Sequence, residues 1–68
     1  MSAGEIVVNG VATALGEGAS VADLVARLGN DRGIAVAVDG EVVPRAEWSS
    51  RRLAPGERVE IVTAVQGG

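Results

Sequence analysis

The sequence of 68 residues predicts an α+β fold, in which a mixed sheet of four to five strands carries one main helix on one face. Three observations predict it. Two short β-type runs flank Asn9-Gly10, a helical stripe of apolar residues follows, and a strictly alternating run over residues 57–64 comes near the end. A helix between strands covers one face of a sheet and leaves the other face open.

The first hairpin is predicted from residues 5–8 and 11–15, the two β-type runs on either side of Asn9-Gly10. Asn-Gly between such runs favours a two-residue turn, because both turn residues need positive φ angles. Side chains alternate between the two faces of a strand, so Val7 is expected on the face opposite to its two apolar neighbours.

A short amphipathic helix is predicted over residues 21–28. Ser20 is a natural N-cap, and Asp23 three residues later approximates a capping box. Gly29 is placed to close the helix in the left-handed conformation. The stripe expected to pack on the sheet has the spacing i, i+3, i+4, i+7 and consists of Val21, Leu24, Val25 and Leu28.

The second hairpin is predicted around Asp39-Gly40, with residues 34–38 as its first strand. Pro44 is expected to end the second strand, because proline cannot donate a ladder hydrogen bond. Residues 45–50 indicate an irregular or single-turn segment, in which Trp48 fills one end of the core; an anchor for a partner is its alternative role. Pro55-Gly56 suits the centre of a type II turn.

The last strand, over residues 57–64, completes the topology. The right-handed crossover rule lets it pair parallel with the first strand in the centre of the sheet. This order of elements is that of a β-grasp, the ubiquitin-like fold. We expect residues 1–64 to form the domain and residues 65–68 to form a flexible C-terminal tail.

The face opposite to the helix is expected to be small and mostly apolar. Such a patch beside the chain end indicates a surface for partners, although isolated surface valines are also normal in any protein. The predicted open face consists of Val7, Ala35, Ala37, Arg58, Glu60, Val62 and Ala64.

Composition argues against an enzyme with its own active site. The chain has no cysteine and no histidine, which removes thiolate chemistry, a histidine-activated nucleophile and the commonest metal ligand. Its formal net charge of -3 disfavours a nucleic-acid binder. No apolar run approaches the length of a membrane span, and the start has no signal pattern. We therefore expect a cytoplasmic protein, monomeric when free and without a metal or a permanently bound cofactor.

The chain ends on Gly67-Gly68, which has no Cβ atoms and can enter a tunnel too narrow for any other dipeptide. Residues 65–68 span roughly 13 Å when extended, at about 3.3–3.6 Å each. A free α-carboxylate is an anion at neutral pH and a poor electrophile. It needs activation, most simply by attack on the α-phosphate of ATP to give an acyl-adenylate.

Three segments resemble the ThiS family, the sulfur carrier proteins of thiamine biosynthesis. They are "VVNG", "AVAVDGEVVPRAEW" and "LAPGERVEIVTAVQGG", and the resemblance covers nearly the whole chain. Asp39-Gly40 stands where many members have Asn-Gly, a change that the same turn accepts. The first hairpin is also shorter and richer in alanine, which affects only where its second strand ends.

The resemblance implies partners, co-substrates and site residues. An adenylyltransferase related to ubiquitin-activating enzymes would consume ATP and Mg to adenylate the carboxylate of Gly68. A persulfide donor, such as a cysteine desulfurase, would then displace AMP and leave a thiocarboxylate. Thiazole synthase would receive that sulfur. Val65, Gln66 and Gly67 would insert into the partner ahead of Gly68.

Two alternatives remain open at this point. The small subunit of molybdopterin synthase shares the predicted fold and the Gly-Gly end. A ubiquitin-like interaction module with an inert tail is the second alternative, and it differs from a carrier because it does not react with ATP.

Overall fold

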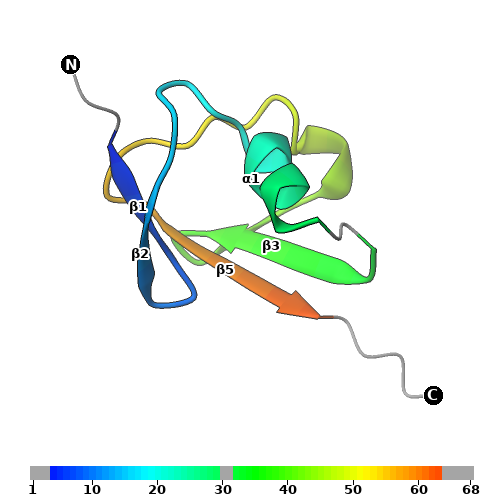
Figure 1. Cartoon of the computed structure of the whole chain (residues 1–68). Helices are drawn as coiled ribbons and strands as arrows, with labels where there is room; N and C mark the ends of the chain where they lie inside the picture. The colour runs from blue at the N-terminus through cyan, green and yellow to red at the C-terminus, as the bar shows by residue number, and fades with distance from the viewer. Residues whose placement is uncertain (1–3, 30–31, 64–68) are drawn as a thin grey trace.

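Five strands form one mixed sheet, and a single α-helix packs on it (Figure 1). The computed structural model describes residues 4–29 and 32–63. The strand order is β2-β1-β5-β3-β4, and only β1 and β5 pair in parallel. The elements are β1 (Glu5–Val8), β2 (Val11–Ala14), α1 (Val21–Leu28), β3 (Ile34–Val38), β4 (Glu41–Val43), the 3₁₀ helix η1 (Arg45–Glu47) and β5 (Arg58–Thr63).

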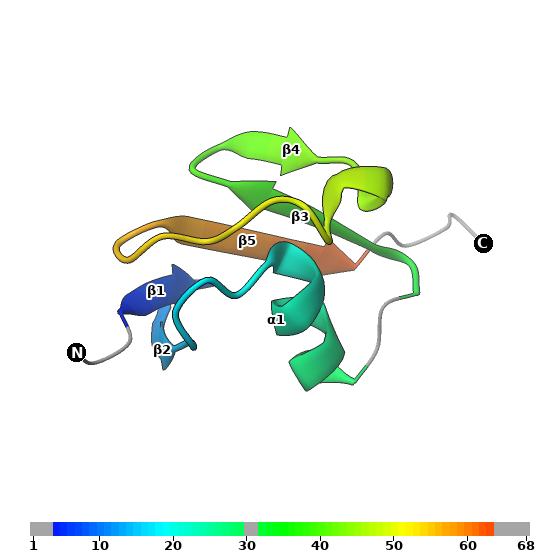
Figure 2. The same ribbon diagram turned by 90° about the horizontal axis from the view of Figure 1, so that it is seen from above.

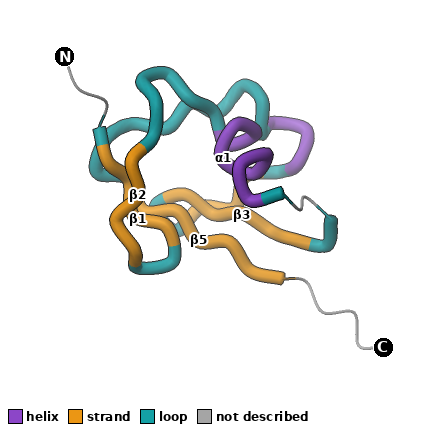
Figure 3. The backbone as a smooth tube through the Cα atoms, in the orientation of Figure 1, coloured by secondary structure: helices purple, strands orange, loops and turns teal. Residues whose placement is uncertain are grey.

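The sheet is the one that the order of sequence patterns predicts. β5 lies in the centre, parallel to β1 and antiparallel to β3. Figure 3 shows α1 and the loop that contains η1 on the same side of the strands. In Figure 2, η1 follows β4 at one edge of the sheet. The architecture is therefore a β-grasp, as predicted.

Both hairpins turn on two residues in the left-handed region. The φ angles are 50° and 85° at Asn9 and Gly10, and 51° and 87° at Asp39 and Gly40. Two-residue hairpin turns require such angles, which Asn, Asp and Gly adopt most easily. The turn predictions are confirmed. β2 ends one residue earlier than predicted, because Leu15 leaves the strand and is buried in the core.

The predicted capping box of α1 is present. The Ser20 hydroxyl accepts a hydrogen bond from the Asp23 backbone N–H at 3.1 Å, and Asp23 Oδ2 accepts one from the Ser20 N–H at 2.9 Å. The Ser20 N–H first, and then the Ser20 hydroxyl, lower the pKa of the Asp23 carboxyl group by hydrogen bonding to it. Gly29 ends the helix with a φ of 82°.

The prediction that Leu28 packs on the sheet is wrong. Val21, Leu24 and Val25 are buried, whereas Leu28 is 51% exposed. The first two turns of α1 lie over the core, but the last turn extends past it, and Leu28 is not among the residues that pack against the core. Helical periodicity gives the direction of a side chain but not the extent of the sheet beneath it.

The core lies between α1 and one face of the sheet. The fully buried strand residues are those that alternation places on this face, and Val8, Ile34 and Ile61 pack at its margin. The buried apolar residues are Ile6, Leu15, Val21, Leu24, Val25, Val36, Val38, Val43, Trp48, Leu53 and Val59.

Trp48 closes one end of this core, as predicted. Its indole is buried, and its Nε1–H donates to the carbonyl oxygen of Val43 at 2.9 Å. The guanidinium carbon of Arg45 lies 4.9 Å from the centre of the ring. A buried indole needs a partner for its N–H, and the end of β4 supplies one.

Candidate functional site

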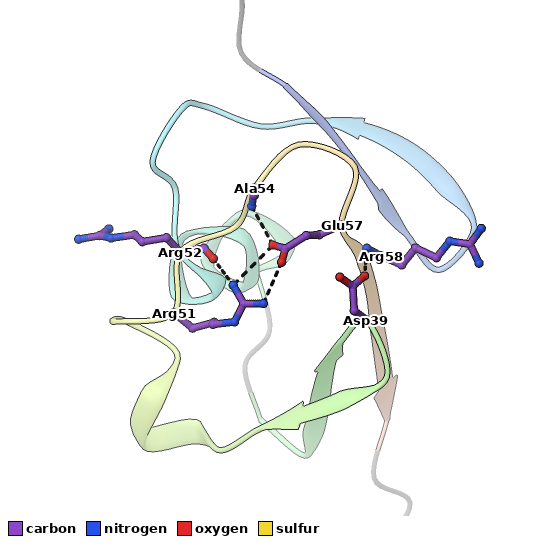
Figure 4. A network of polar contacts seen from close by, with 6 residues as sticks. All are labelled: Asp39, Arg51, Arg52, Ala54, Glu57 and Arg58. Atoms are coloured by element: carbon purple, nitrogen blue, oxygen red, sulfur yellow. Dashed lines mark hydrogen bonds and ion pairs between the residues drawn. The ribbon is translucent and has the colours of Figure 1, made fainter.

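The acidic side chains do not gather into a metal or acid–base site. Across residues 4–29 and 32–63, no group of three or more His, Cys, Asp or Glu residues could hold a metal ion. The densest polar network joins Arg51, Glu57 and two backbone groups in front of β5 (Figure 4). This network is therefore the first candidate for a site that acts on a substrate.

The Glu57 carboxylate is fully engaged in this network. It accepts from Arg51 Nη2 at 2.9 Å and from the Ala54 backbone N–H at 2.8 Å, and Arg51 Nη1 also donates to the carbonyl oxygen of Arg52. The bond from Arg51 lowers the pKa of Glu57, and the same bond raises the pKa of Arg51. A carboxylate that these bonds keep ionised is poorly suited to accept and release protons in catalysis. We therefore interpret the network as structural: it joins residues 51–54 to Glu57.

The face opposite to α1 is the remaining candidate. Val7 lies opposite Arg58, Ala35 opposite Val62, and Ala37 opposite Glu60 in the ladders. Opposite residues in a sheet share a face, so these six predicted residues lie together on the side away from the core. Their side chains are exposed or half-buried.

Sequence reasoning missed Val42, which belongs to the same face. Val42 lies opposite Ala37 and is 71% exposed, compared with 57% for Val62. The two-residue turn at Asp39-Gly40 fixes the register of that hairpin. The register was therefore the signal that could have placed Val42 on the open face beforehand.

This face is hollowed where β1 and β5 meet. The hollow lies beside the turn between β1 and β2, and its lining combines three valines with polar residues and one charged residue of each sign. Its lining residues are Val7, Asn9, Gly10, Arg58, Val59, Glu60 and Val62. The open face thus combines apolar surface, both signs of charge and a concave region.

The remaining predicted site residues lie outside the described residues. They belong to residues 64–68 and are Ala64, Val65, Gln66, Gly67 and Gly68. Thr63 is the last residue of β5, so the strand that carries Arg58, Glu60 and Val62 is also the one that precedes this segment.

Comparison of the sequence with models of protein families identifies the family of this chain. The model of the ThiS family matches residues 4–68. The chain belongs to the ThiS family. This match covers the β-grasp domain, the open face and the final two glycines, and it confirms the resemblance noted in the sequence. At family level, the protein is a sulfur carrier of thiamine biosynthesis.

A solved structure supports the same membership. The crystal structure of a thiamine biosynthesis protein (ThiS) from Geobacter metallireducens is similar to this chain, with a TM-score of 0.81 and 25% sequence identity. The alignment covers 94% of this chain and 99% of that chain. The comparison with curated proteins found no match. Within the described ranges of the ThiS-family chain, no helix is long and apolar enough to cross a membrane.

Proposed function

We propose that the carboxylate of Gly68 is adenylated and then converted to a thiocarboxylate, which donates its sulfur to thiazole formation. The observation that carries this proposal is the match of the ThiS family model, which runs through Gly67 to Gly68. In this proposal the chain is a co-substrate of partner enzymes and not itself an enzyme.

The chemistry proceeds in three steps. The Gly68 carboxylate attacks the α-phosphate of ATP, whose charge Mg²⁺ offsets, and pyrophosphate leaves. The terminal sulfur of a persulfide on a donor protein then attacks the acyl carbon and displaces AMP. A second thiol reduces the resulting acyl disulfide, which releases the thiocarboxylate and leaves a disulfide on the donor side. The ATP-binding site, the persulfide and the second thiol all belong to partner proteins, and this chain contributes only the carboxylate of Gly68.

The residues before Gly68 would carry the carboxylate into the partner. Extended, residues 65–68 reach roughly 13 Å, and Gly67 and Gly68 place no side chain in the way. Ordering each of these residues costs about 1–2 kcal/mol. The tail alone therefore supplies little net affinity, and a preformed surface has to supply the rest.

The open face is the surface best suited to that task. Val42 and Val62 are its most exposed large apolar side chains, and Ala35 and Ala37 between them allow a partner to approach closely. We propose that an adenylyltransferase of the ubiquitin-activating type and a thiazole synthase both dock on this face. The protein would act in the cytoplasm, where it would be monomeric between these encounters.

Changing the C-terminus tests the carrier function. Deleting Gly68, or adding one residue after it, is expected to abolish thiocarboxylate formation while the fold stays intact, because only a correctly placed carboxylate reaches the α-phosphate. Intact mass is measured after incubation with ATP, sulfide and the cognate activating enzyme. The parent should gain the mass that corresponds to exchange of one oxygen atom for sulfur.

Two controls complete this experiment. Circular dichroism of the altered chains should match that of the parent. Sulfur loading of an extended chain without trimming would contradict the proposal. An unreactive parent would support the inert interaction module instead.

A further inference from the structure

The side chain of Asn9 continues the hydrogen-bond ladder along β5 beyond the end of β1. Its Oδ1 accepts from the Ile61 N–H at 2.9 Å, and its Nδ2 donates to the Ile61 carbonyl oxygen at 3.1 Å. β1 ends at Val8, opposite Val59, and the chain turns away at Gly10. The amide thus stands in for the backbone groups that a longer β1 would have presented to Ile61.

The turn favours asparagine at this position but does not require it, because aspartate also suits such a turn. Asp39 occupies the corresponding place in the other hairpin, with nearly the same φ, and its Oδ1 accepts from the Arg58 N–H at 2.9 Å. An ionised aspartate can only accept hydrogen bonds, whereas an amide both accepts and donates. Asn9 uses both abilities on the two backbone groups of Ile61.

The position of Ile61 along β5 gives this pair of bonds a specific effect. On one side, β5 stays paired with β3 as far as Thr63, which lies opposite Ile34. On the other side, β1 pairs only with the beginning of β5, and the Asn9 amide supplies the contact to Ile61. Figure 1 shows β5 running on past the end of β1. Asn9 therefore hydrogen-bonds to the edge of β5 that faces β1, at Ile61, two residues before the strand ends at Thr63.

We propose that Asn9 is a positioning residue for the reaction at Gly68, because its amide fixes the direction in which the end of β5 leaves the sheet. The inference rests on the proposed function. Thr63 is the last residue of β5 and directly precedes the segment that ends at Gly68, so the end of β5 is the point from which that segment starts relative to the open face. A displacement of about 1 Å can lower the rate of a positioned reaction by about a hundredfold.

The test compares Asn9→Gly with Asp39→Gly in the full chain. Each variant leaves Gly-Gly at the tip of a two-residue hairpin, which such turns accept, and each removes side-chain hydrogen bonds to the backbone of β5. They differ in position, since Asp39 bonds to the first residue of β5 and Asn9 bonds to Ile61 near its end. Steady-state adenylation by the cognate activating enzyme is measured for both.

We expect Asn9→Gly to lower kcat about tenfold or more while KM stays within about twofold of the parent value. Asp39→Gly should keep both constants close to those of the parent. Amide hydrogen exchange provides an independent readout: exchange at Ile61 should accelerate in Asn9→Gly more than exchange in the core strands. A role in stability alone would reduce the folded fraction of the carrier, which raises the apparent KM and leaves kcat unchanged.

Asn9→Asp serves as a second variant, because aspartate suits the same turn. It loses the donor to Ile61 and sets a carboxylate oxygen against the carbonyl oxygen, so the same fall in kcat is expected. Parent-like kcat in both Asn9 variants, or an equal fall in Asp39→Gly, overturns the inference. A rise in KM with unchanged kcat also overturns it, because Asn9 would then be a docking contact. If the parent itself is not adenylated, the proposed function fails and this role fails with it.

Discussion

At the scale of single residues, the Glu57 carboxylate ties the loop before β5 to its neighbours. Its side chain is 18% exposed and binds both the Arg51 guanidinium and the Ala54 N–H. Folding lowers the pKa of Glu57 from its ordinary value of 4.5, chiefly through the bond from Arg51. The contribution of this network to stability is therefore present above pH 4.5 and is lost as the pH falls through the lowered value.

Glu57→Gln should make stability less sensitive to acid. The variant is less stable than the parent near neutral pH, but its free energy of unfolding should fall less steeply between about pH 5 and pH 3, because no carboxylate at position 57 takes up a proton on unfolding. Urea denaturation across this range measures the slope. Glu17→Gln removes an exposed carboxylate outside the network, and it should keep the slope of the parent. Identical slopes for all three proteins would exclude Glu57 as a source of acid sensitivity.

At the scale of elements, α1 depends on its N-terminal cap. The helix has only eight residues, and isolated helices of this length are marginal in water. Ser20 is buried, exchanges two hydrogen bonds with Asp23 and lies beside the 51–53 segment, where the Val21 N–H donates to the Arg51 carbonyl oxygen. The cap thus both starts the helix and joins it to the loop that leads to β5.

Ser20→Ala should destabilise the domain by about 1 kcal/mol, because the N–H of Asp23 loses its acceptor. In a domain of this size, that loss corresponds to a fall in Tm of about 4–8 °C. Calorimetry or thermal circular dichroism measures it. Ser49→Ala, the same change at an exposed position outside α1, should alter stability by less than about 0.5 kcal/mol. Equal melting of Ser20→Ala and the parent would show that the cap adds nothing.

Local patterns predicted the elements and their order because local chemistry controls them. The positive φ angles at the two hairpin turns, the capping box and the alternation along β5 are each set by residues close in sequence. The bonds from Asn9 to Ile61 were not predictable in this way, since the two residues are 52 positions apart and meet only in the folded sheet. The prediction that Leu28 is buried was wrong for a related reason, because the exposure of this side chain depends on where the sheet ends.

The candidate site was predictable to a different extent. Alternation placed Val7, Ala35 and Val62 on one face correctly, and only the register of the second hairpin adds Val42. The residues after Thr63 lie outside the described residues, so their part in the site stays a prediction from the sequence.

At the scale of the whole molecule, the two faces of the sheet differ in burial. One face of the sheet is buried under α1 and the η1 loop, and the other carries exposed Val42 and Val62 beside Arg58 and Glu60. A substitution on the open face therefore leaves the core untouched. This separation allows docking to be tested without unfolding the protein.

Val62→Asp should leave the circular dichroism spectrum and the melting temperature almost unchanged and weaken binding to the activating enzyme severely. Its side chain is 57% exposed and apolar, and aspartate there would bury an unpaired charge in the interface next to Glu60. Val42→Asp, on the same face, should act in the same direction. Val11→Asp is the matched control, because Val11 is 64% exposed but lies opposite Val8 on the other face. Calorimetric titration with the activating enzyme should give weakened binding for Val62→Asp and Val42→Asp and parent-like binding for Val11→Asp. Parent-like binding and sulfur loading by Val62→Asp and Val42→Asp would rule out the open face as the docking surface. Equal weakening by Val11→Asp would mean that the added negative charge, and not the position of the valine, weakens binding to the activating enzyme.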